Sequence, residues 1–457
     1  MRAYRSTLAS GNAGAKYTVS IIRNNKISPL SSSYKYAFQG NTTIVDNVAI
    51  GKKVGRCSGM FADCTSFNQN VKIPGAVVQC DEMFKNCTNL DQNIKIPDGV
   101  SNCSNVFYGC SKLNQNIKLS SSATSCVNAF YGCTNLNQNI AIPSNVIATD
   151  SMFGECSILN QAIGIPDKAM TCWSMFINCH TLNQNVKLSN NAYDVRFMFY
   201  GCENLNQNIA IPASVTYAHS MFRGCSNLNQ NIQLPTNLDN CLYMFYGCSK
   251  LNQRIGIPSS VNKDISNMFH GCTSLNQEIY IPDHVSNCEN MFSDTNMTSI
   301  GHLPNYGHSF VNMFTNSKFN TTISFDFQRD YNSSDLAPID YENMFANSKM
   351  NSDIYFLGDY RLNYQAYNML RGCEDFGANI YFRRNVMIAG LLRDCNKLKI
   401  KTLHCLNGNR FLDTLLNNSV YGSLTGTTIT WSQSETQDRV VTYYNTYYNI
   451  YVRDDIT

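Results

Sequence analysis

The sequence predicts an α/β solenoid, a stack of about sixteen short coils that each hold one β-strand and one short helical segment. Two observations predict this fold class. The phrase CSGMFADCTSFNQNVKIP at residues 57–74 returns 23 residues later as CDEMFKNCTNLDQNIKIP at residues 80–97. Within each phrase, the apolar residues change from a helical spacing to a strand spacing. A fixed period of this length is typical of repeat proteins, in which each coil packs only on its neighbours.

The phenylalanine of the repeated Met-Phe pair marks the coils. It recurs every 23 residues from Phe38 to Phe245. The interval then loosens over six further coils, whose marker residues are Phe269, Phe292, Phe314, Phe345, Leu370 and Leu392. We therefore predict a solenoid over residues 35–405, with an inserted loop at residues 327–343.

The first half of each coil has the spacing of a helix. In one coil, the apolar residues stand at i, i+3, i+4 and i+7, as Cys57, Met60, Phe61 and Cys64. This spacing would place all four side chains on one face of a helix. We therefore predict a short helical segment at the start of each coil.

The second half of each coil has a period of two residues. Val71 and Ile73 flank Lys72, and Pro74 follows them. The alternation predicts a strand with one buried face, and proline typically ends such a strand because it has no N–H for the ladder. Stacked coils would pair these strands into a parallel sheet along one side of the solenoid.

The phrase C-x-x-L-N-Q-x-I-x-I-P, with Met-Phe three or four residues upstream, resembles the BspA-like leucine-rich repeats of bacterial surface adhesins and related mycoplasma surface proteins. The resemblance covers about residues 35–400. It implies a leucine-rich-repeat-like solenoid and attachment to a host cell or polymer. Such repeats specify a fold strongly and a ligand hardly at all.

Two flanking segments depart from the repeat. Residues 1–34 include KYTVSII, a predicted strand, and we interpret them as an N-terminal cap or anchoring arm. Residues 406–457 are rich in β-forming residues and tyrosine, which predicts a C-terminal β cap or assembly module. Both ends of an open solenoid need such covers because they expose its core.

Seventeen of the twenty cysteines form two columns at the coil spacing. The first holds Cys64, Cys87, Cys110, Cys133, Cys156, Cys179, Cys202, Cys225, Cys248 and Cys272, and the second holds Cys57, Cys80, Cys103, Cys126, Cys172, Cys241 and Cys288. The residues that replace cysteine are Ser317 and Ser348 in the first column, and Thr149, Val195, Ala218 and Asp264 in the second. Because most replacements keep a small volume and none keeps sulfur, we interpret the cysteines as buried packing residues. No C-x-x-C pair supports a zinc site, and we expect folding in a reducing compartment.

An Asn-Gln pair recurs before each strand, with aspartate in place of asparagine only at Asp91 among residues 68–277. Amides stacked at strand spacing can bond one another and the turn backbone. We interpret them as a structural ladder, with sugar binding as the second interpretation.

Function is expected where the coils differ. The exposed face of the predicted sheet gives these candidate ligand-binding residues: Lys72, Lys95, Lys118, Lys187, Asn70, Asn93, Asn116, Arg254 and Tyr280. They suit an extended anionic or carbohydrate partner, although a lysine row on a solvated sheet more often serves solubility and edge protection. A second row, of Tyr108, Tyr131, Tyr200 and Tyr246, would stack on sugars or cover the predicted helical side.

The sequence holds no catalytic motif. The exposed sheet positions carry one carboxylate, Glu278, and the seven histidines fall in no H-E-x-x-H, G-x-S-x-G or phosphate-loop setting. The formal charge of +3 is too small to indicate nucleic acid, and no apolar run reaches eighteen residues. We therefore predict a protein that is not an enzyme, without cofactor, metal, nucleic-acid partner or membrane insertion.

These observations predict non-enzymatic recognition of a host surface glycan or protein, within an oligomeric assembly. Residues 1–25 lack the apolar core of a secretory signal, and the thiol columns favour a reducing compartment. Both points favour a bacteriophage virion component, a tail or head fibre with receptor-binding or decoration function, displayed on the virion surface beside other virion proteins. An exported adhesin at the bacterial cell surface and a purely architectural virion protein remain as alternatives.

Overall fold

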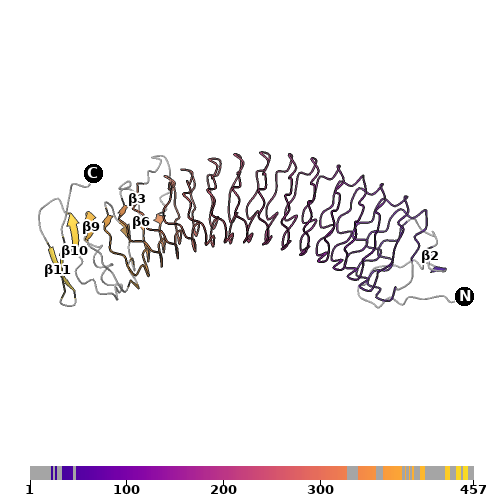
Figure 1. The fold of residues 1–457 in the computed structure, drawn as a ribbon, viewed down its shortest axis with the longest axis horizontal. Coiled ribbons are helices and arrows are strands. Elements are labelled where there is room, and N and C mark those ends of the chain that lie inside the picture. Colours follow the sequence, from indigo (N-terminus) through magenta and orange to yellow (C-terminus); the bar gives the residue numbers. More distant parts are fainter. Residues whose placement is uncertain are drawn as a thin grey trace. The chain divides into compact units, whose positions relative to one another are not determined.

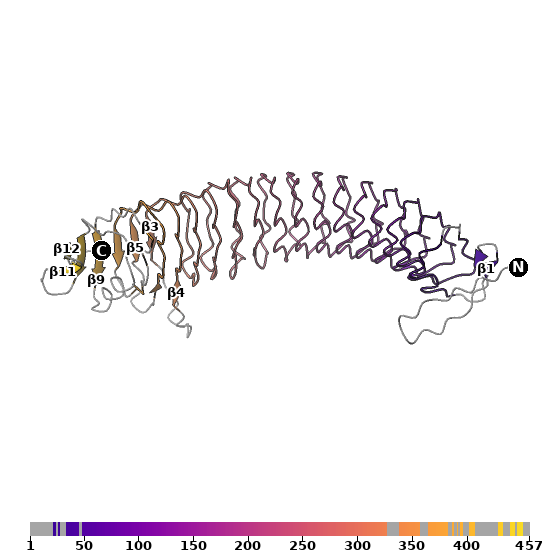
Figure 2. The ribbon, with the colours of Figure 1, turned by 90° about the horizontal axis from the view of Figure 1, so that it is seen from below.

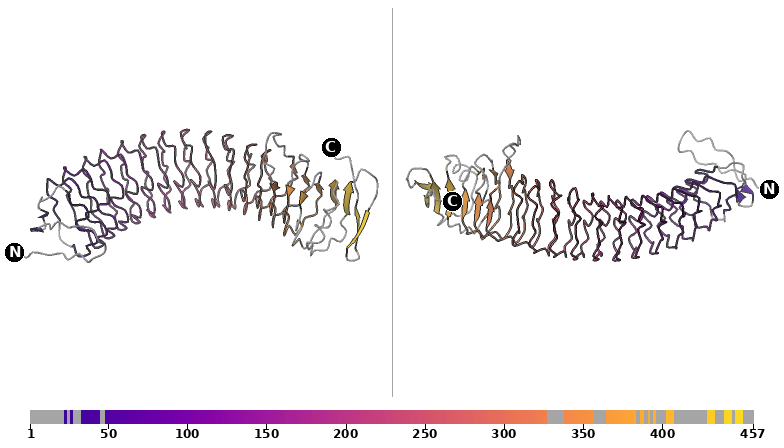
Figure 3. Two further views of the ribbon diagram at one scale, coloured as in Figure 1. Left: turned by 180° about the vertical axis from the view of Figure 1, so that it is seen from behind. Right: turned by 90° about the horizontal axis from the view of Figure 1, so that it is seen from above.

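The computed structural model describes residues 33–44, 48–326, 338–356 and 364–382, together with short segments outside these ranges. The short segments are residues 22–23, 26–27, 386–387, 391, 394–395, 402–406, 428–432, 439–443 and 446–450. The chain divides into two compact units, residues 1–215 and residues 216–457. In each unit, the successive coils of the chain lie side by side, as three directions of view show (Figures 1, 2 and 3).

The backbone of each coil alternates between two kinds of hydrogen bond. In residues 57–63, every second N–H donates to a carbonyl of the next coil, 22 residues further on, at N···O distances of 2.7–2.9 Å. The N–H groups of Met60, Ala62 and Cys64 donate instead to carbonyls three residues earlier, at 3.0–3.1 Å. This segment is a run of β-turns, and no helix occurs among the described residues, so the predicted helical segments are wrong. A run of turns can place the side chains at positions i, i+3, i+4 and i+7 on one side of the backbone, as a helix does, so the apolar spacing did not distinguish the two.

Residues with left-handed backbone conformation explain why turns form here. Two residues of a typical coil, placed two positions before and two after the marker phenylalanine, have positive φ. Around Phe107 they are Asn105 at 55° and Gly109 at 70°. A positive φ interrupts an α-helix but suits the third residue of a type II turn. Glycine, asparagine and aspartate adopt it at least cost, and their recurrence at these two positions is the sequence signal for turns.

The predicted strand position is only weakly paired in the first unit. Val71 and Ile73 are buried and Lys72 is exposed, as the alternation predicts. Among the described residues of this unit, the position forms one parallel bridge, between Lys95 and Lys118. A second row of parallel bridges joins residues five positions before the marker phenylalanines: Ser33, Arg56 and Gln79, then Asn102, Ser125, Ala148, Thr171 and Asp194. The described strands of this unit are β1 (Ile22–Arg23) and β2 (Lys26–Ile27), an antiparallel pair.

Regular parallel sheets occur in the second unit. Five strands form one parallel sheet in the order β10-β9-β7-β5-β3, namely β3 (Ile323–Phe325), β5 (Ile354–Phe356), β7 (Ile380–Phe382), β9 (Thr402–Leu406) and β10 (Thr428–Ser432). A second parallel sheet has the order β4-β6-β8, with β4 (Ile339–Asp340), β6 (Tyr364–Gln365) and β8 (Val386–Met387). The antiparallel pair β11 (Arg439–Tyr443) and β12 (Thr446–Ile450) completes the unit. The predicted terminal domains, most of the inserted loop and the marker Leu392 lie largely outside the described residues, so these boundaries stay predictions.

The marker phenylalanines form the centre of the core. Within each unit, consecutive rings stack nearly parallel, with centroids 5.5–5.7 Å apart, from Phe38 to Phe199 and from Phe222 to Phe345. From Phe61 onward these rings are fully buried. Each stacked pair adds roughly 0.5–1.5 kcal/mol to the free energy gained by burial.

The nineteen cysteines whose side chains the structure describes, which exclude Cys405, are buried free thiols, and this confirms their predicted packing position. The first column has a further role. The Sγ of Cys87 donates to the carbonyl of Phe61 at 3.0 Å, and the Sγ of Cys133 donates to that of Phe107 at 3.1 Å. Burial raises the pKa of Cys57 to about 12 and that of Cys64 to about 11. These thiols therefore stay protonated at neutral pH, and those of the first column stay linked to the preceding coil.

One predicted replacement in the second cysteine column is wrong. Ile265, not Asp264, occupies the buried position, and its N–H donates to the carbonyl of Asn287 as the column cysteines do in other coils. Asp264 lies in the adjacent row of bridges, paired with Asn287. The interval from Phe245 to Phe269 is one residue longer than the repeat, so counting by 23 selects the wrong residue. The column therefore holds no carboxylate at this coil.

Candidate functional site

The predicted asparagine ladder joins neighbouring coils. The Oδ1 of Asn114 accepts the backbone N–H of Asn137 at 3.0 Å and the Nε2 of Gln138 at 3.1 Å. The Oδ1 of Asp91 accepts the equivalent bonds from Asn114 and Gln115, at 3.0 and 2.9 Å. Because the position needs only an acceptor oxygen, aspartate can replace asparagine there. These oxygens are occupied within the fold, which favours the structural interpretation.

Lys72, Lys95 and Lys118 form what we call the lysine row, one exposed lysine at the same position of three successive coils. The bridge between Lys95 and Lys118 places the last two directly opposite each other. Backbones paired in this way lie about 4.8 Å apart, and like charges in that position repel. In the described part of the chain, the row has a single ion pair, from Lys95 Nζ to Asp98 Oδ2 at 3.6 Å. Hydrogen bonds from Ser121, with a contribution from Lys95, hold the pKa of Asp98 below its usual value.

The other predicted residues of the first unit flank this row. Asn70, Asn93 and Asn116 are exposed, two residues before each lysine. Lys187 is also exposed, but Ala141 and Gly164 occupy the two intervening coils. The structure therefore gathers six of the predicted residues into one compact polar surface and leaves Lys187 apart from it.

The remaining two predicted residues belong to the second unit and contact each other. The guanidinium of Arg254 lies 5.0 Å from the ring centroid of Tyr280, a cation–π contact. Tyr280 is half exposed. This pair is a separate surface feature of the second unit.

The predicted tyrosine row is only partly accessible. Tyr108 and Tyr131 stack with their ring centroids 5.1 Å apart, and Tyr246 stacks on His270 at 4.7 Å. These tyrosines and Tyr200 are of intermediate exposure. The arrangement favours the interpretation that they cover the turn side of the coils.

The sequence reasoning missed an exposed apolar cluster in the first unit, formed by Ile147, Met170, Trp173 and Tyr193. The exposed fractions of these side chains are 44%, 44%, 44% and 39%. The N–H of Met170 donates to the carbonyl of Ile147 at 2.8 Å, and that of Tyr193 donates to the carbonyl of Met170 at 3.0 Å. Three of the four residues therefore stand at the same position of adjacent coils. Ser101 and Thr124 hold this position in the two preceding coils, and that change from polar to apolar was the available signal.

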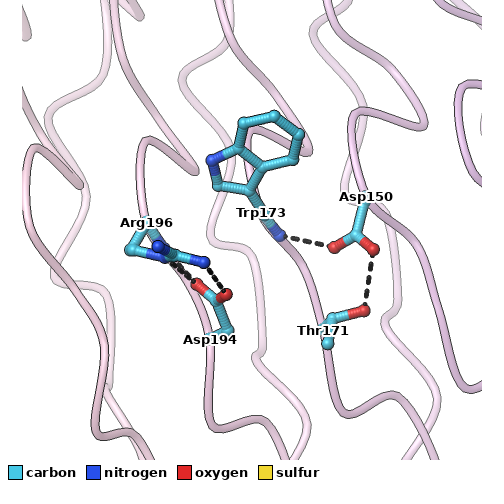
Figure 4. A network of polar contacts seen from close by, with 5 residues as sticks. All are labelled: Asp150, Thr171, Trp173, Asp194 and Arg196. Carbon is cyan, nitrogen blue, oxygen red and sulfur yellow. Dashed lines mark hydrogen bonds and ion pairs between the residues drawn. The ribbon is translucent and has the colours of Figure 1, made fainter.

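Two polar pairs lie beside the apolar cluster (Figure 4). Asp150 accepts the hydroxyl of Thr171 at 2.9 Å and the backbone N–H of Trp173 at 3.0 Å. Arg196 donates from Nε and Nη2 to the two oxygens of Asp194, at 2.9 and 2.6 Å. The indole ring of Trp173 points away from both pairs. Burial raises the pKa of Asp150 above its usual value.

The described residues offer little for catalysis. Histidine contacts a carboxylate in three separate places, His180 with Glu203, His270 with Asp294 and His302 with Asp283. No group of three metal-ligating side chains is found in the described residues. A shallow polar depression lies over the ladder, lined by Ser66, Asn68, Asn89, Asp91, Lys112 and Asn135. The described residues also contain no helix long and apolar enough to cross a bilayer.

The sequence matches the family described as "Mycoplasma protein of unknown function, DUF285" in five overlapping stretches, residues 31–142, 103–212, 170–280, 236–304 and 258–383. Together these cover residues 31–383, which is most of the chain. No curated protein matches the sequence.

Two solved structures are similar. A leucine-rich repeat protein from Bacteroides ovatus has a TM-score of 0.55 at 20% identity, with 90% of this chain and 94% of that chain covered. At this identity, the likeness shows the fold alone, and it supports the predicted leucine-rich-repeat-like solenoid. A leucine rich cell surface protein from Faecalibacterium prausnitzii has a TM-score of 0.35 at 22% identity, over 58% of this chain and 85% of that chain. A score that low carries no argument.

Proposed function

This chain belongs to the mycoplasma protein family DUF285, of unknown function, and we propose that it is a non-enzymatic recognition protein of the bacterial surface that binds an extended anionic polymer. The binding surface is the lysine row with the flanking Asn70, Asn93 and Asn116. The observation that carries the proposal is the presence of three exposed lysines on successive coils with a single internal ion pair among the described residues.

The electrostatics of the row favour a multivalent anion. The positive charges of adjacent lysines repel each other and destabilise the folded chain, because like charges opposite one another on neighbouring strands are unfavourable. A polymer with charges spaced along its length would relieve this repulsion at every coil. The neighbouring asparagines add hydrogen-bond donors and acceptors for hydroxyl or sulfate groups. The BspA-like resemblance of the repeat supports attachment to a surface polymer.

The bacterial surface is better supported than the virion surface. The family is named for mycoplasma proteins, and nothing in the comparisons points to a virion. One of the two points behind the virion hypothesis was that the thiols need a reducing compartment. Oxidation requires an accessible thiolate, whereas these thiols are buried, and burial raises the pKa of most of them, such as to about 12 for Cys57 and about 11 for Cys64. Cys103 is an exception, because a hydrogen bond with Cys126 lowers its pKa. The buried thiols would therefore persist at an oxidising surface.

Titration of the full chain with dextran sulfate, polygalacturonate and uncharged dextran tests the proposal. Replacing Lys72, Lys95 and Lys118 together by glutamine should weaken binding of the two anionic polymers roughly 10- to 100-fold, at ~0.5–1 kcal/mol for each exposed charge contact. Affinity should fall as salt rises, because screening shortens the range of the attraction. Uncharged dextran should not bind.

A matched control replaces three other exposed lysines of the first unit, Lys52, Lys53 and Lys112, by glutamine. This control removes the same number of positive charges as the row variant, and its affinities for the polymers should stay within about twofold of those of the unmodified chain. Equal losses in both triple variants would reject the row as a site and indicate only nonspecific charge attraction. Unchanged binding together with lost assembly in the row variant would favour the architectural alternative.

A further inference from the structure

The apolar cluster lies on three adjacent coils. Its residues Ile147, Met170 and Tyr193 follow one another through backbone hydrogen bonds of 2.8 and 3.0 Å. Trp173 is three residues from Met170 on the same coil, and its side chain is exposed to the same extent. Exposed single apolar residues are ordinary, whereas adjacent ones with a polar rim mark interaction sites.

Of the two carboxylates beside the apolar cluster, only one is paired with a cation. The two hydrogen bonds between Arg196 and Asp194 neutralise that pair within the chain. Asp150, on the coil that precedes Trp173, forms no ion pair within the described residues. Its carboxylate accepts only uncharged donors, Thr171 and the N–H of Trp173. Asp194 and Arg196 shift the pKa of Asp150 in opposite directions, so this pair supplies no net compensating cation, and burial leaves the pKa raised. A cationic partner can replace the hydration that such a partly buried carboxylate loses.

Trp173 lies between these two pairs along the stack. The N–H of Ser151, next to Asp150, donates to the carbonyl of Trp173 at 2.7 Å, and the N–H of Ser174, next to Trp173, donates to that of Arg196 at 2.9 Å. Trp173 and Asp150 therefore stand on successive coils, where the backbone N–H of Trp173 donates to the Asp150 carboxylate and the indole ring extends away from it (Figure 4). An indole face attracts cations as a carboxylate does, so both groups favour the same charge on a partner.

We propose that the apolar cluster is a second binding site, which takes a protein partner that presents a Lys or Arg side chain among apolar side chains. The composition favours protein over glycan. Tryptophan, tyrosine, methionine and arginine are the residues enriched at the centres of protein interfaces. Ile147 and Met170 offer a sugar neither a flat stacking face nor a hydrogen bond. The charged end of the basic residue would lie at Asp150 and its methylene stem along the indole of Trp173, and the apolar residues would cover Ile147, Met170 and Tyr193.

This site is independent of the lysine row. The two surfaces share no residue, occupy different positions of the repeat and favour partners of opposite charge. Failure of polymer binding at the row would leave this proposal unaffected, and the reverse also holds.

A displayed random peptide library, selected on the full chain, tests the proposal. Selection is followed by removal of peptides that bind the Trp173→Ala, Met170→Ser double variant. The retained sequences should be enriched in Lys or Arg next to large apolar residues. Absence of any retained sequence, or enrichment of acidic residues, would overturn the proposal.

Fluorescence titration then measures each retained peptide. The chain has two tryptophans, so the Trp431→Phe background leaves Trp173 as the reporter. Asp150→Asn, which removes the charge but keeps an acceptor oxygen, should weaken binding of a basic peptide at least fivefold and flatten its salt dependence. The controls are Ile158→Ser, an apolar residue of similar exposure outside the cluster, and Asp167→Asn, an exposed carboxylate outside it.

Both controls should bind within about twofold of the parent. Equal losses in Asp150→Asn and Asp167→Asn would overturn the assignment of the basic side chain. Two further experiments test other occupants. If the fluorescence of Trp173 responds to neutral oligosaccharides but to no peptide, the partner is a glycan and the proposal is overturned. If the chain self-associates in a sedimentation experiment and Met170→Ser abolishes this association, the partner is a second copy of the chain and the proposal is likewise overturned.

Discussion

The coils of residues 57–120 and those of residues 314–382 are built from the same repeat, but only the second group forms a regular parallel sheet. In the first group, the segments 71–73 and 94–96 are followed by Pro74 and Pro97. In the second, β3, β5 and β7 are followed by Asp326, Leu357 and Arg383. Proline has no N–H to donate to the preceding coil, so the ladder cannot continue through it.

The comparison teaches that the sheet is optional in this fold. Coils with and without proline share the stacked phenylalanines and the turn hydrogen bonds between coils. The stack is therefore held by columns of identical side chains and by the turn backbone. Four predictions examine this account, from the largest expected effect to the smallest.

The largest effect should come from high pH. Burial raises the pKa of Cys64 from the usual 9.0 to about 11 and that of Cys57 to about 12. The unfolded chain loses these protons at lower pH than the folded chain, so the thiol contribution to stability is complete below about pH 9 and is lost as pH rises towards 11–12. Urea unfolding at pH 7, 9 and 10.5 should give falling midpoints.

Peptide-resolved alkylation of the same samples sharpens the comparison. The coils around Ser317 and Ser348 hold no thiol at the first-column position, so the cysteine-rich coils of the first unit should become reactive first. Simultaneous reaction of Cys64 and Cys373 would mean that the whole chain unfolds as one body and that thiol ionisation has no regional effect.

The next largest effect should come from the phenylalanine column. Phe176→Ala in the first unit and Phe345→Ala in the second each remove a fully buried ring and should destabilise their coils by about 3–5 kcal/mol. Hydrogen exchange of the neighbouring backbone N–H groups measures the local loss. Similar losses are expected, because both regions depend on the column. A loss near Phe345 less than half that near Phe176 would contradict this, since the sheet would then carry the second region.

An intermediate effect is expected at the asparagine ladder. Asn114→Ala leaves the N–H of Asn137 and the amide of Gln138 without their acceptor and should cost about 1–3 kcal/mol. Asn114→Asp supplies the same oxygen, as Asp91 does naturally, and should cost less than half as much. Urea unfolding of both variants provides the measurement. Equal losses would show that the donor N–H groups of Asn114, and not its oxygen, stabilise the coil.

The smallest effect should follow removal of a proline. Pro97→Ala restores one N–H at the end of a strand position and should change stability by less than about 1 kcal/mol, because the gained bond offsets the lost rigidity. Hydrogen exchange at the new N–H reports whether it pairs with the preceding coil. Strong protection there, as within β5, would confirm that proline limits the sheet. Rapid exchange would indicate that the Asn-Gln turn before the strand, and not proline, prevents the parallel sheet from extending.

Much of the site could be predicted from sequence and part of it could not. The lysine row was predictable because Lys72 stands between two buried residues, and alternation alone exposes it. The apolar cluster was missed because its residues, such as Met170, lie in a segment that the strand and helix periods did not cover. Its position became clear only from the backbone bonds between coils.

The sequence by itself determined the repeat, the buried columns and the exposed lysines, because a fixed spacing of like residues forces them to stack. The tertiary structure alone decided that turns replace helices, that Ile265 and not Asp264 is buried, and that Asp150, Trp173 and Arg196 become neighbours. The physical reason is that these outcomes depend on hydrogen bonds between coils 22 or 23 residues apart, which local periodicity does not encode.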